Sequence, residues 1–158
     1  MTRAPDPSPL DASLGYWLRS ASNQVSHGLS LKLAAREVTA AEWVLLRMIY
    51  AHDVGAPKRL ARDLGMTKGA ISKLVDRLAG KGLASKAPMT SDRRHQDVWL
   101  TPAGRALVPE LAMLADANDE EYFGHLSIAE RGALKAMLRD IVEPRGVGGQ
   151  RIAASIHQ

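Results

Sequence analysis

Residues 60–78 read LARDLGMTKGAISKLVDRL and predict two short helices joined by a tight turn. Gly65 should end the first helix, because glycine adopts the left-handed conformation at a helix terminus without a Cβ clash. Thr67 is a good N-cap for the second helix, since its hydroxyl can accept a hydrogen bond from an N–H of the first turn. The spacing i, i+3, i+4, i+7, which buries one narrow stripe of a helix, is occupied by Ile71, Leu74, Val75 and Leu78. The pair is therefore expected to form a helix-turn-helix.

The opposite face of the second helix is polar, and the protein core does not require it. Gly69 and Ser72 are small, so this face could approach a flat surface closely. Hydrogen bonds to phosphates or to base edges in a DNA major groove could come from Ser72, Lys68, Lys73 and Arg77. For the helix alone, an ordinary solvated face is an equally good interpretation, because most amphipathic helices have one.

After Gly82 the pattern changes from helical spacing to short extended runs at residues 83–87 and 97–101. In the second run Val98 and Leu100 alternate with Asp97, Trp99 and Thr101, which suits a strand with one buried face. The two runs predict a β-hairpin that directly follows the polar helix.

The turn-rich segment between the two strands carries Arg93 and Arg94 near the hairpin tip. A hairpin in this position is typical of a wing, whose arginines can enter an adjacent minor groove, where negative potential is concentrated. The alternative is a basic surface loop without a partner. The position straight after the helix-turn-helix favours the wing.

The helix-turn-helix, the wing and the segment VWLTPAG at residues 98–104 together resemble the winged-helix core of the MarR family of bacterial transcriptional regulators. The family pattern is Asp-x-Arg, three residues, an apolar residue, any residue, Leu-Thr, two residues and Gly. Residues 92–104 fit it throughout. The resemblance covers roughly residues 11–143, although the helices outside the core match only by pattern.

The resemblance implies that Arg94 enters the minor groove, that Asp92 helps to hold the wing arginine, and that the face from Lys68 to Arg77 reads the major groove. Many family members have Ile-Glu or a similar pair where this chain has Ala84-Ser85. The residue that follows, Lys86, is expected to face a DNA phosphate. The residues expected to bind DNA are Thr67, Lys68, Gly69, Ser72, Lys73, Arg77, Lys86, Asp92, Arg93 and Arg94.

Charge is concentrated in the same part of the chain. Residues 57–94 contain ten Lys or Arg and three Asp, whereas the rest of the chain contains eleven basic and fourteen acidic residues. A basic block on an otherwise mildly acidic protein indicates a polyanion-binding module. Double-stranded DNA is therefore the expected partner. A membrane surface is not, because no helix combines a basic face with exposed aromatic anchors.

The chain has 158 residues, of which 46% are hydrophobic and 24% charged, as expected for one globular domain. The first residues lead into a Pro-rich stretch and not an apolar signal, so a cytoplasmic location is expected. The sequence has no cysteine, which excludes disulfides, thiolate zinc sites and a cysteine redox switch. No phosphate-binding glycine loop, HExxH or Gly-x-Ser-x-Gly motif is present, so we expect no enzyme, cofactor or metal site.

The predicted fold class is mainly α with a small β wing, combining a winged helix-turn-helix core with a helical dimerisation region. Asp11 could cap a long first helix, which Gly28 could bend or loosen. Capping boxes at Thr39–Glu42 and Ser127–Glu130, and the pair Thr101-Pro102, mark three further helix starts. The expected organisation is a disordered arm at 1–10, a dimerisation helix at 11–36, the DNA-binding core at 37–104, dimerisation helices at 105–145 and a flexible tail at 146–158.

The helices outside the core have more apolar surface than one small module needs, which predicts a two-fold homodimer and a pseudo-palindromic operator.

Polar and amphipathic residues on the edge of the first helix could line a small-molecule pocket together with a tryptophan of the next helix. These candidates are Trp17, Ser20, Gln24, His27 and Trp43. A simple boundary between core and solvent is the more common explanation of such a pattern. The family resemblance implies a small aromatic or phenolic effector. The alternative function is that of an architectural DNA-binding protein without sequence preference.

Overall fold

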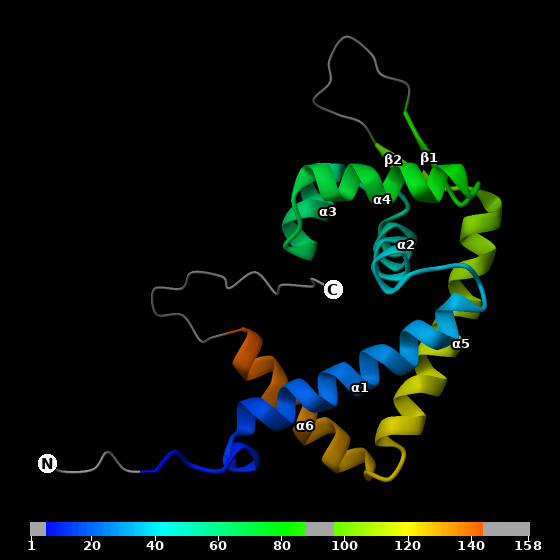
Figure 1. Cartoon of the computed structure of the whole chain (residues 1–158). Coiled ribbons are helices and arrows are strands. Elements are labelled where there is room, and N and C mark those ends of the chain that lie inside the picture. The colour runs from blue at the N-terminus through cyan, green and yellow to red at the C-terminus, as the bar shows by residue number, and fades with distance from the viewer. Residues whose placement is uncertain (1–5, 88–96, 144–158) are drawn as a thin grey trace, which may run out of the picture.

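The long helix α5 (Pro102–Phe123) runs along one side of the molecule and joins two groups of elements (Figure 1). The computed structural model describes residues 6–87 and 97–143. One group consists of α2 (Ala40–His52), α3 (Pro57–Leu64), α4 (Lys68–Gly80), β1 (Ala84–Lys86) and β2 (Val98–Leu100). The other consists of the short 3-10 helix η1 (Leu10–Ala12), α1 (Leu14–Ala34) and α6 (Ile128–Val142). The predicted class, mainly α with a small β wing, is confirmed.

The predicted helix starts are confirmed at four positions and wrong at one. Thr39 and Ser127 both form complete capping boxes, and Thr67 and Thr101 cap α4 and α5. Asp11, by contrast, does not cap α1. It lies inside η1, and Ser13 is the N-cap of α1, accepting a hydrogen bond from the Tyr16 N–H. Both residues are favoured N-caps, so composition alone could not separate them.

The hydrophobic core lies in the group that contains the helix-turn-helix. All four apolar residues predicted to face inward on α4 are buried, and they pack with Leu45, Leu46 and Ile49 of α2. Val108 and Leu111 of α5 and Leu33 of α1 extend the same core. Packing on its inner side therefore sets how deeply α4 lies in the fold.

The two strands pair antiparallel, with Ala84 opposite Leu100 and Lys86 opposite Val98. Val98 and Leu100 are buried and Trp99 is exposed, as the alternation predicts. Gly55, in the break between α2 and α3, forms an additional bridge to Val98 that the sequence did not reveal. The base of the wing is thus held from two sides.

α1 crosses α5 at Gly28, which is buried. A Cβ at this position would lie 2.7 Å from the Tyr122 ring and 2.8 Å from the Asn118 Oδ1, so only glycine fits. Gly28 therefore permits the crossing and does not interrupt the helix, which continues to Ala34. Asn118 is also buried, and its amide donates to the Val25 carbonyl and accepts from Lys32.

Candidate nucleic-acid interface

The turn between α3 and α4 has the geometry that its sequence predicts. Gly65 adopts the left-handed conformation with φ 63°, and Pro57 occupies the first turn of α3. The Thr67 hydroxyl accepts a hydrogen bond from the Ala70 N–H at 3.1 Å. These contacts fix the first turn of α4, where Lys68 and Gly69 are exposed.

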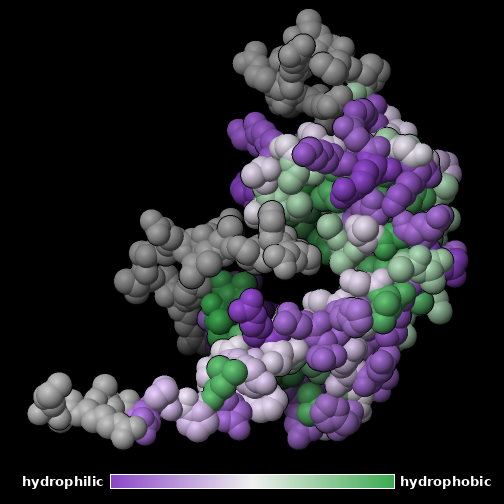
Figure 2. All heavy atoms as spheres, viewed as in Figure 1, coloured by the Kyte–Doolittle hydropathy of each residue, from purple (hydrophilic) through white to green (hydrophobic). Residues whose placement is uncertain are grey.

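The outer face of α4 is polar and open to solvent. Thr67, Lys68, Gly69, Ser72 and Lys73 are all exposed, and Figure 2 shows a hydrophilic surface over this helix. At Gly69 a Cβ would have its nearest neighbour 4.0 Å away, so the backbone itself lies at the surface. This face can approach a polyanion closely and donate several charged hydrogen bonds to it.

The base of the wing is joined to α4 by an ion pair. Lys86 Nζ of β1 lies 2.5 Å from the Asp76 Oδ1, and both side chains are partly exposed. The amine of Lys86 therefore lies on the same side of the molecule as the polar face of α4, and an acidic partner shares its charge. Asp92, Arg93 and Arg94, the predicted tip residues, lie outside the described residues.

Arg77 is placed differently from the other predicted DNA-binding residues of α4. Its Nε lies 3.5 Å from Oε1 of Glu42, a carboxylate of α2 that is only 1% exposed. Lys81, which the sequence analysis counted only as part of the basic block, donates to both oxygens of Glu42 at 3.0 and 2.9 Å. The capping box at Thr39 is visible in the sequence, but the contact of its glutamate with α4 is not.

The pKa of Glu42 is lowered by this environment. Burial of the carboxylate by itself raises its pKa, but the hydrogen bonds from Lys81 and the Thr39 N–H, together with the positive charges of Lys81 and Arg77, outweigh burial. Glu42 is therefore a buried anion whose counter-ions both come from α4.

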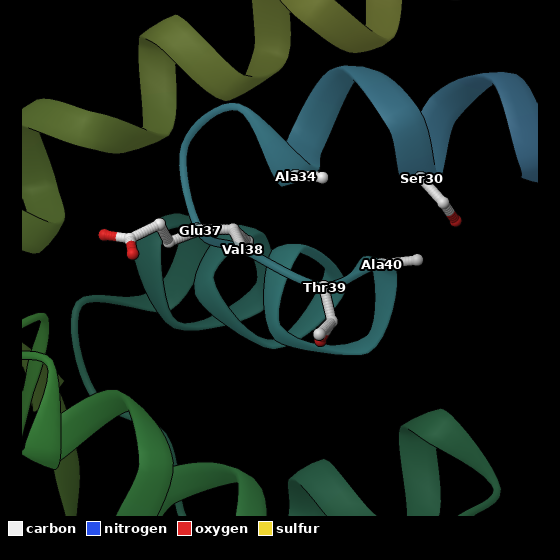
Figure 3. Close-up of a pocket in the computed structure, with 6 residues that line it drawn as sticks. All are labelled: Ser30, Ala34, Glu37, Val38, Thr39 and Ala40. Atoms are coloured by element: carbon white, nitrogen blue, oxygen red, sulfur yellow. The ribbon is translucent and has the colours of Figure 1, made fainter.

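The five residues predicted to bind a ligand lie on α1 and α2. Trp17, Gln24 and His27 are exposed on α1, and the indole N–H of Trp17 donates to the Asp11 carbonyl at 2.7 Å. Ser20 is half-buried, and Trp43 packs against the core from α2. A hollow of about 380 Å³ lies instead at the end of α1, the following turn and the start of α2 (Figure 3), lined by Ser30, Ala34, Glu37, Val38, Thr39 and Ala40.

Other kinds of site find no support in the described ranges. Within residues 6–87 and 97–143, no three His, Cys, Asp or Glu side chains are grouped so that they could hold a metal ion. None of the helices in these ranges combines the length and the apolar character needed to cross a bilayer. The acidic residues near the end of α5 take part in ion pairs, Glu120 with Arg131 and Glu121 with Lys32.

Residues 38–96, which include the helix-turn-helix and the first strand of the wing, match the model of the MarR family. The transcriptional repressor NicR of Pseudomonas putida is 26% identical over 140 residues, a match that covers 87% of this chain and 89% of NicR. Part of the chain thus matches the MarR family, and most of the chain is similar to a transcriptional repressor.

Solved structures of MarR family regulators have the same fold. A mutant MarR from E. coli in complex with operator DNA is 25% identical, with a TM-score of 0.73 over 82% of this chain and 93% of that one. BpsR of Bordetella bronchiseptica, whose DNA binding is regulated by 6-hydroxynicotinic acid, is 26% identical, with a TM-score of 0.77 over 89% of this chain and all of that one. The chain therefore has the winged helix-turn-helix fold of these regulators.

Proposed function

We propose that this chain is a sequence-specific repressor that binds a pseudo-palindromic operator as a homodimer. The observation that carries the proposal is the exposed polar face of α4 beside the base of a wing. In this arrangement Thr67, Lys68, Gly69, Ser72 and Lys73 face the major groove. Lys86 lies near the phosphates, the wing residues Arg93 and Arg94 enter the adjacent minor groove, and Asp92 helps to hold the wing arginine.

The dimer is proposed from the second group of elements. None of the fifteen residues of α6 is buried. Ile128 is 92% exposed, and four further apolar residues of the helix are also open to solvent, namely Met137, Leu138, Ile141 and Val142. At the other end of the chain, Leu14 of α1 is 87% exposed. Apolar helix faces of this kind are normally covered, and a second copy of the chain offers the same faces in a closed two-fold arrangement.

Two-fold symmetry determines the form of the operator. Two copies of α4 related by a two-fold axis would occupy major grooves about one helical turn apart, roughly 34 Å from centre to centre. The proposed half-sites are therefore inverted repeats. A protein bound across them excludes other proteins from a promoter, which is the simplest form of repression.

The proposed effector is a small aromatic acid or phenol that binds between the dimerisation helices and the DNA-binding part. BpsR, whose DNA binding 6-hydroxynicotinic acid regulates, supports this chemical class. Candidate contacts are Trp17, Ser20, Gln24, His27 and Trp43, together with the hollow at the start of α2. The ligand must bind the DNA-incompetent form more tightly, because equal affinity for both forms shifts no equilibrium.

Selection of binding sites from random duplex DNA, followed by anisotropy titration at fixed salt, tests the central proposal. The selected duplex should be palindromic and should bind at least about 10³-fold more tightly than its scrambled counterpart. Equal and salt-sensitive affinity for both duplexes would instead support the architectural alternative.

Calorimetry with 6-hydroxynicotinate and with simple phenols tests the proposed effector. Absence of both binding heat and operator release would contradict this proposal.

A wing variant tests the minor-groove contact. Arg94→Ala should weaken operator binding by about 1–3 kcal/mol, because an arginine in a narrow groove interacts with concentrated negative potential. The variant must remain folded and dimeric, which circular dichroism and light scattering can establish. Unchanged operator affinity in such a protein would contradict the proposed role of the wing.

A further inference from the structure

We propose that Glu42 is a positioning residue of the recognition helix α4, and that its counter-ions Lys81 and Arg77 hold this helix and do not bind DNA phosphates. This inference rests on the proposed operator binding. It assigns a new role to Arg77, which the sequence pattern placed on the DNA-binding face. It also gives functions to Glu42 and Lys81, which lie outside that face.

The first step is the environment of Glu42. Its carboxylate is 1% exposed, and one of its oxygens accepts the Thr39 N–H at 2.9 Å within the capping box of α2. A buried carboxylate that loses its cations is left with an uncompensated charge, which is far more costly than the loss of a surface pair. Movement of either cation toward a phosphate would therefore be opposed by the charge left behind.

The second step is the saturation of Lys81. Its ammonium group donates to the two oxygens of Glu42 at 3.0 and 2.9 Å and to the Glu37 carbonyl at 2.6 Å. An ammonium group has three N–H donors, so these three acceptors use all of them. A phosphate could bind Lys81 only by displacing one of these contacts.

The third step is the position of these contacts along α4. Lys81 is the C-cap of the helix and Arg77 lies one turn earlier, whereas Lys68 and Lys73 lie on the outer face of the first two turns. The inner contacts thus hold the C-terminal end of α4 against the start of α2 and the turn at Glu37. The outer residues are left free for DNA.

The consequence is control of specificity. Direct readout of bases requires side chains held within about 0.5 Å and 10–20° of the productive geometry. Packing of the apolar stripe sets how deeply α4 lies in the fold. A stripe of similar aliphatic residues resists sliding and rotation of the helix less well than the hydrogen bonds and ion pairs to Glu42 at its C-terminal end. Loss of these contacts should reduce discrimination between sequences more than it reduces general attraction to DNA.

The experiment measures the salt dependence of binding by the full-length protein to the selected operator and to a scrambled duplex, between about 50 and 200 mM salt. Each lysine or arginine that neutralises a phosphate contributes about 0.9 to the slope of log affinity against log salt. Lys81→Gln and Arg77→Gln should leave this slope unchanged on both duplexes and reduce the operator-to-scramble ratio about tenfold. The matched control, Lys68→Gln combined with Lys73→Gln, should reduce the slope by about one to two.

Glu42→Gln tests the same link from the opposite side. It should reduce the operator-to-scramble ratio by a similar factor, and the double variant Glu42→Gln, Lys81→Gln should be no worse than either single variant, because both remove the same contact. If Glu42→Gln does not fold, as judged by circular dichroism, Arg77→Gln decides the question, since Lys81 still neutralises the Glu42 carboxylate in that variant.

A slope reduced by about 0.9 in Lys81→Gln or Arg77→Gln would overturn the inference, because that residue would then bind phosphate. An unchanged slope together with an unchanged operator-to-scramble ratio would overturn it as well. The slope on the scrambled duplex can be measured even if the wild-type chain shows no operator preference. Failure of the proposed function can thus be distinguished from failure of this assignment.

Discussion

Gly104 and Leu83 approach each other more closely than any side chain at position 104 would allow. A Cβ on Gly104 would lie 1.9 Å from the Leu83 carbonyl oxygen, which belongs to the backbone and cannot rotate away. Thr101, three residues earlier in the chain, donates its N–H to this same carbonyl and its hydroxyl to the Gly82 carbonyl. The glycine of the family pattern therefore keeps the start of α5 against the chain that leads into the wing.

Gly104→Ala should destabilise the protein by about 3 kcal/mol, because the new methyl group must push two backbone segments apart. Gly80→Ala is the matched control, since nothing lies within 4 Å of a Cβ at Gly80 near the end of α4. The control should change stability by less than about 1 kcal/mol. Urea unfolding of both variants measures the difference, and equal unfolding midpoints would contradict this account of Gly104.

Glu42 should make stability depend on pH in an identifiable window. Its pKa in the folded protein is lowered, so the folded state binds this proton more weakly than the unfolded chain, where glutamate has a pKa of about 4.3. The stabilisation is complete above that pKa and is lost as the pH falls through the lowered folded value. Acidification should therefore remove it.

Glu42→Gln should lower the free energy of unfolding by about 1–2 kcal/mol at neutral pH, because the charged hydrogen bonds to Lys81 are lost. The difference from wild type should shrink below about pH 4. Asp63, Glu120 and Glu130 also have lowered pKa values, but they are present in both proteins and cancel in the comparison. A difference that stays constant from pH 7 to pH 3 would exclude Glu42 as its source.

The sequence predicted those features of the helices that depend on residues close together in the chain, and it missed contacts between residues far apart in the chain. The turn at Gly65, the caps at Thr39 and Thr67 and the buried stripe of α4 follow from spacings of a few residues, and all are present. The pairing of Glu42 with Lys81 joins positions 39 residues apart, so no local pattern contains it. The α4 residues proposed to contact DNA are exposed, and their roles in DNA binding stay predictions.

The ion pair between Asp76 and Lys86 gives a test at the scale of elements, because it joins the recognition helix to the wing. Asp76→Asn removes a negative charge beside the proposed DNA surface and frees Lys86 for phosphate. Affinity for operator and scrambled duplex should both rise, by about threefold to tenfold at low salt, and the salt slope should increase by about 0.9. Stability should change by less than about 1 kcal/mol, since both side chains are partly exposed.

The control for this variant is Glu110→Gln, which breaks an equally exposed pair between Glu110 of α5 and Arg36 of the turn after α1. It removes the same charge and should leave both affinities nearly unchanged, because neither residue is among those proposed to bind DNA. Weaker binding of Asp76→Asn to both duplexes would show that the ion pair positions the wing, and that Lys86 does not gain a phosphate.

The whole molecule divides its charge and its apolar surface between two ends. Residues 57–87, the part of the basic block that the structure describes, lie in the group around α4, whereas the exposed apolar residues of α6 and of the start of α1 lie in the other group (Figure 1). A monomer would leave the second surface in water. Covering it with a second copy places two basic surfaces in one particle, which increases affinity for a palindrome through effective concentration.

Met137→Asp combined with Ile141→Asp should therefore convert the dimer into a monomer, because two carboxylates would be buried without partners. Light scattering measures the mass, and anisotropy should show loss of operator affinity by at least about 10²-fold, since each half-site then binds alone. The control is Ala136→Asp, about 140° round α6 from Ile141, which should stay dimeric. The DNA-binding group should remain folded in all variants, because α6 contributes no buried residue to its core. A double variant that stays dimeric and binds its operator normally would place the subunit interface elsewhere.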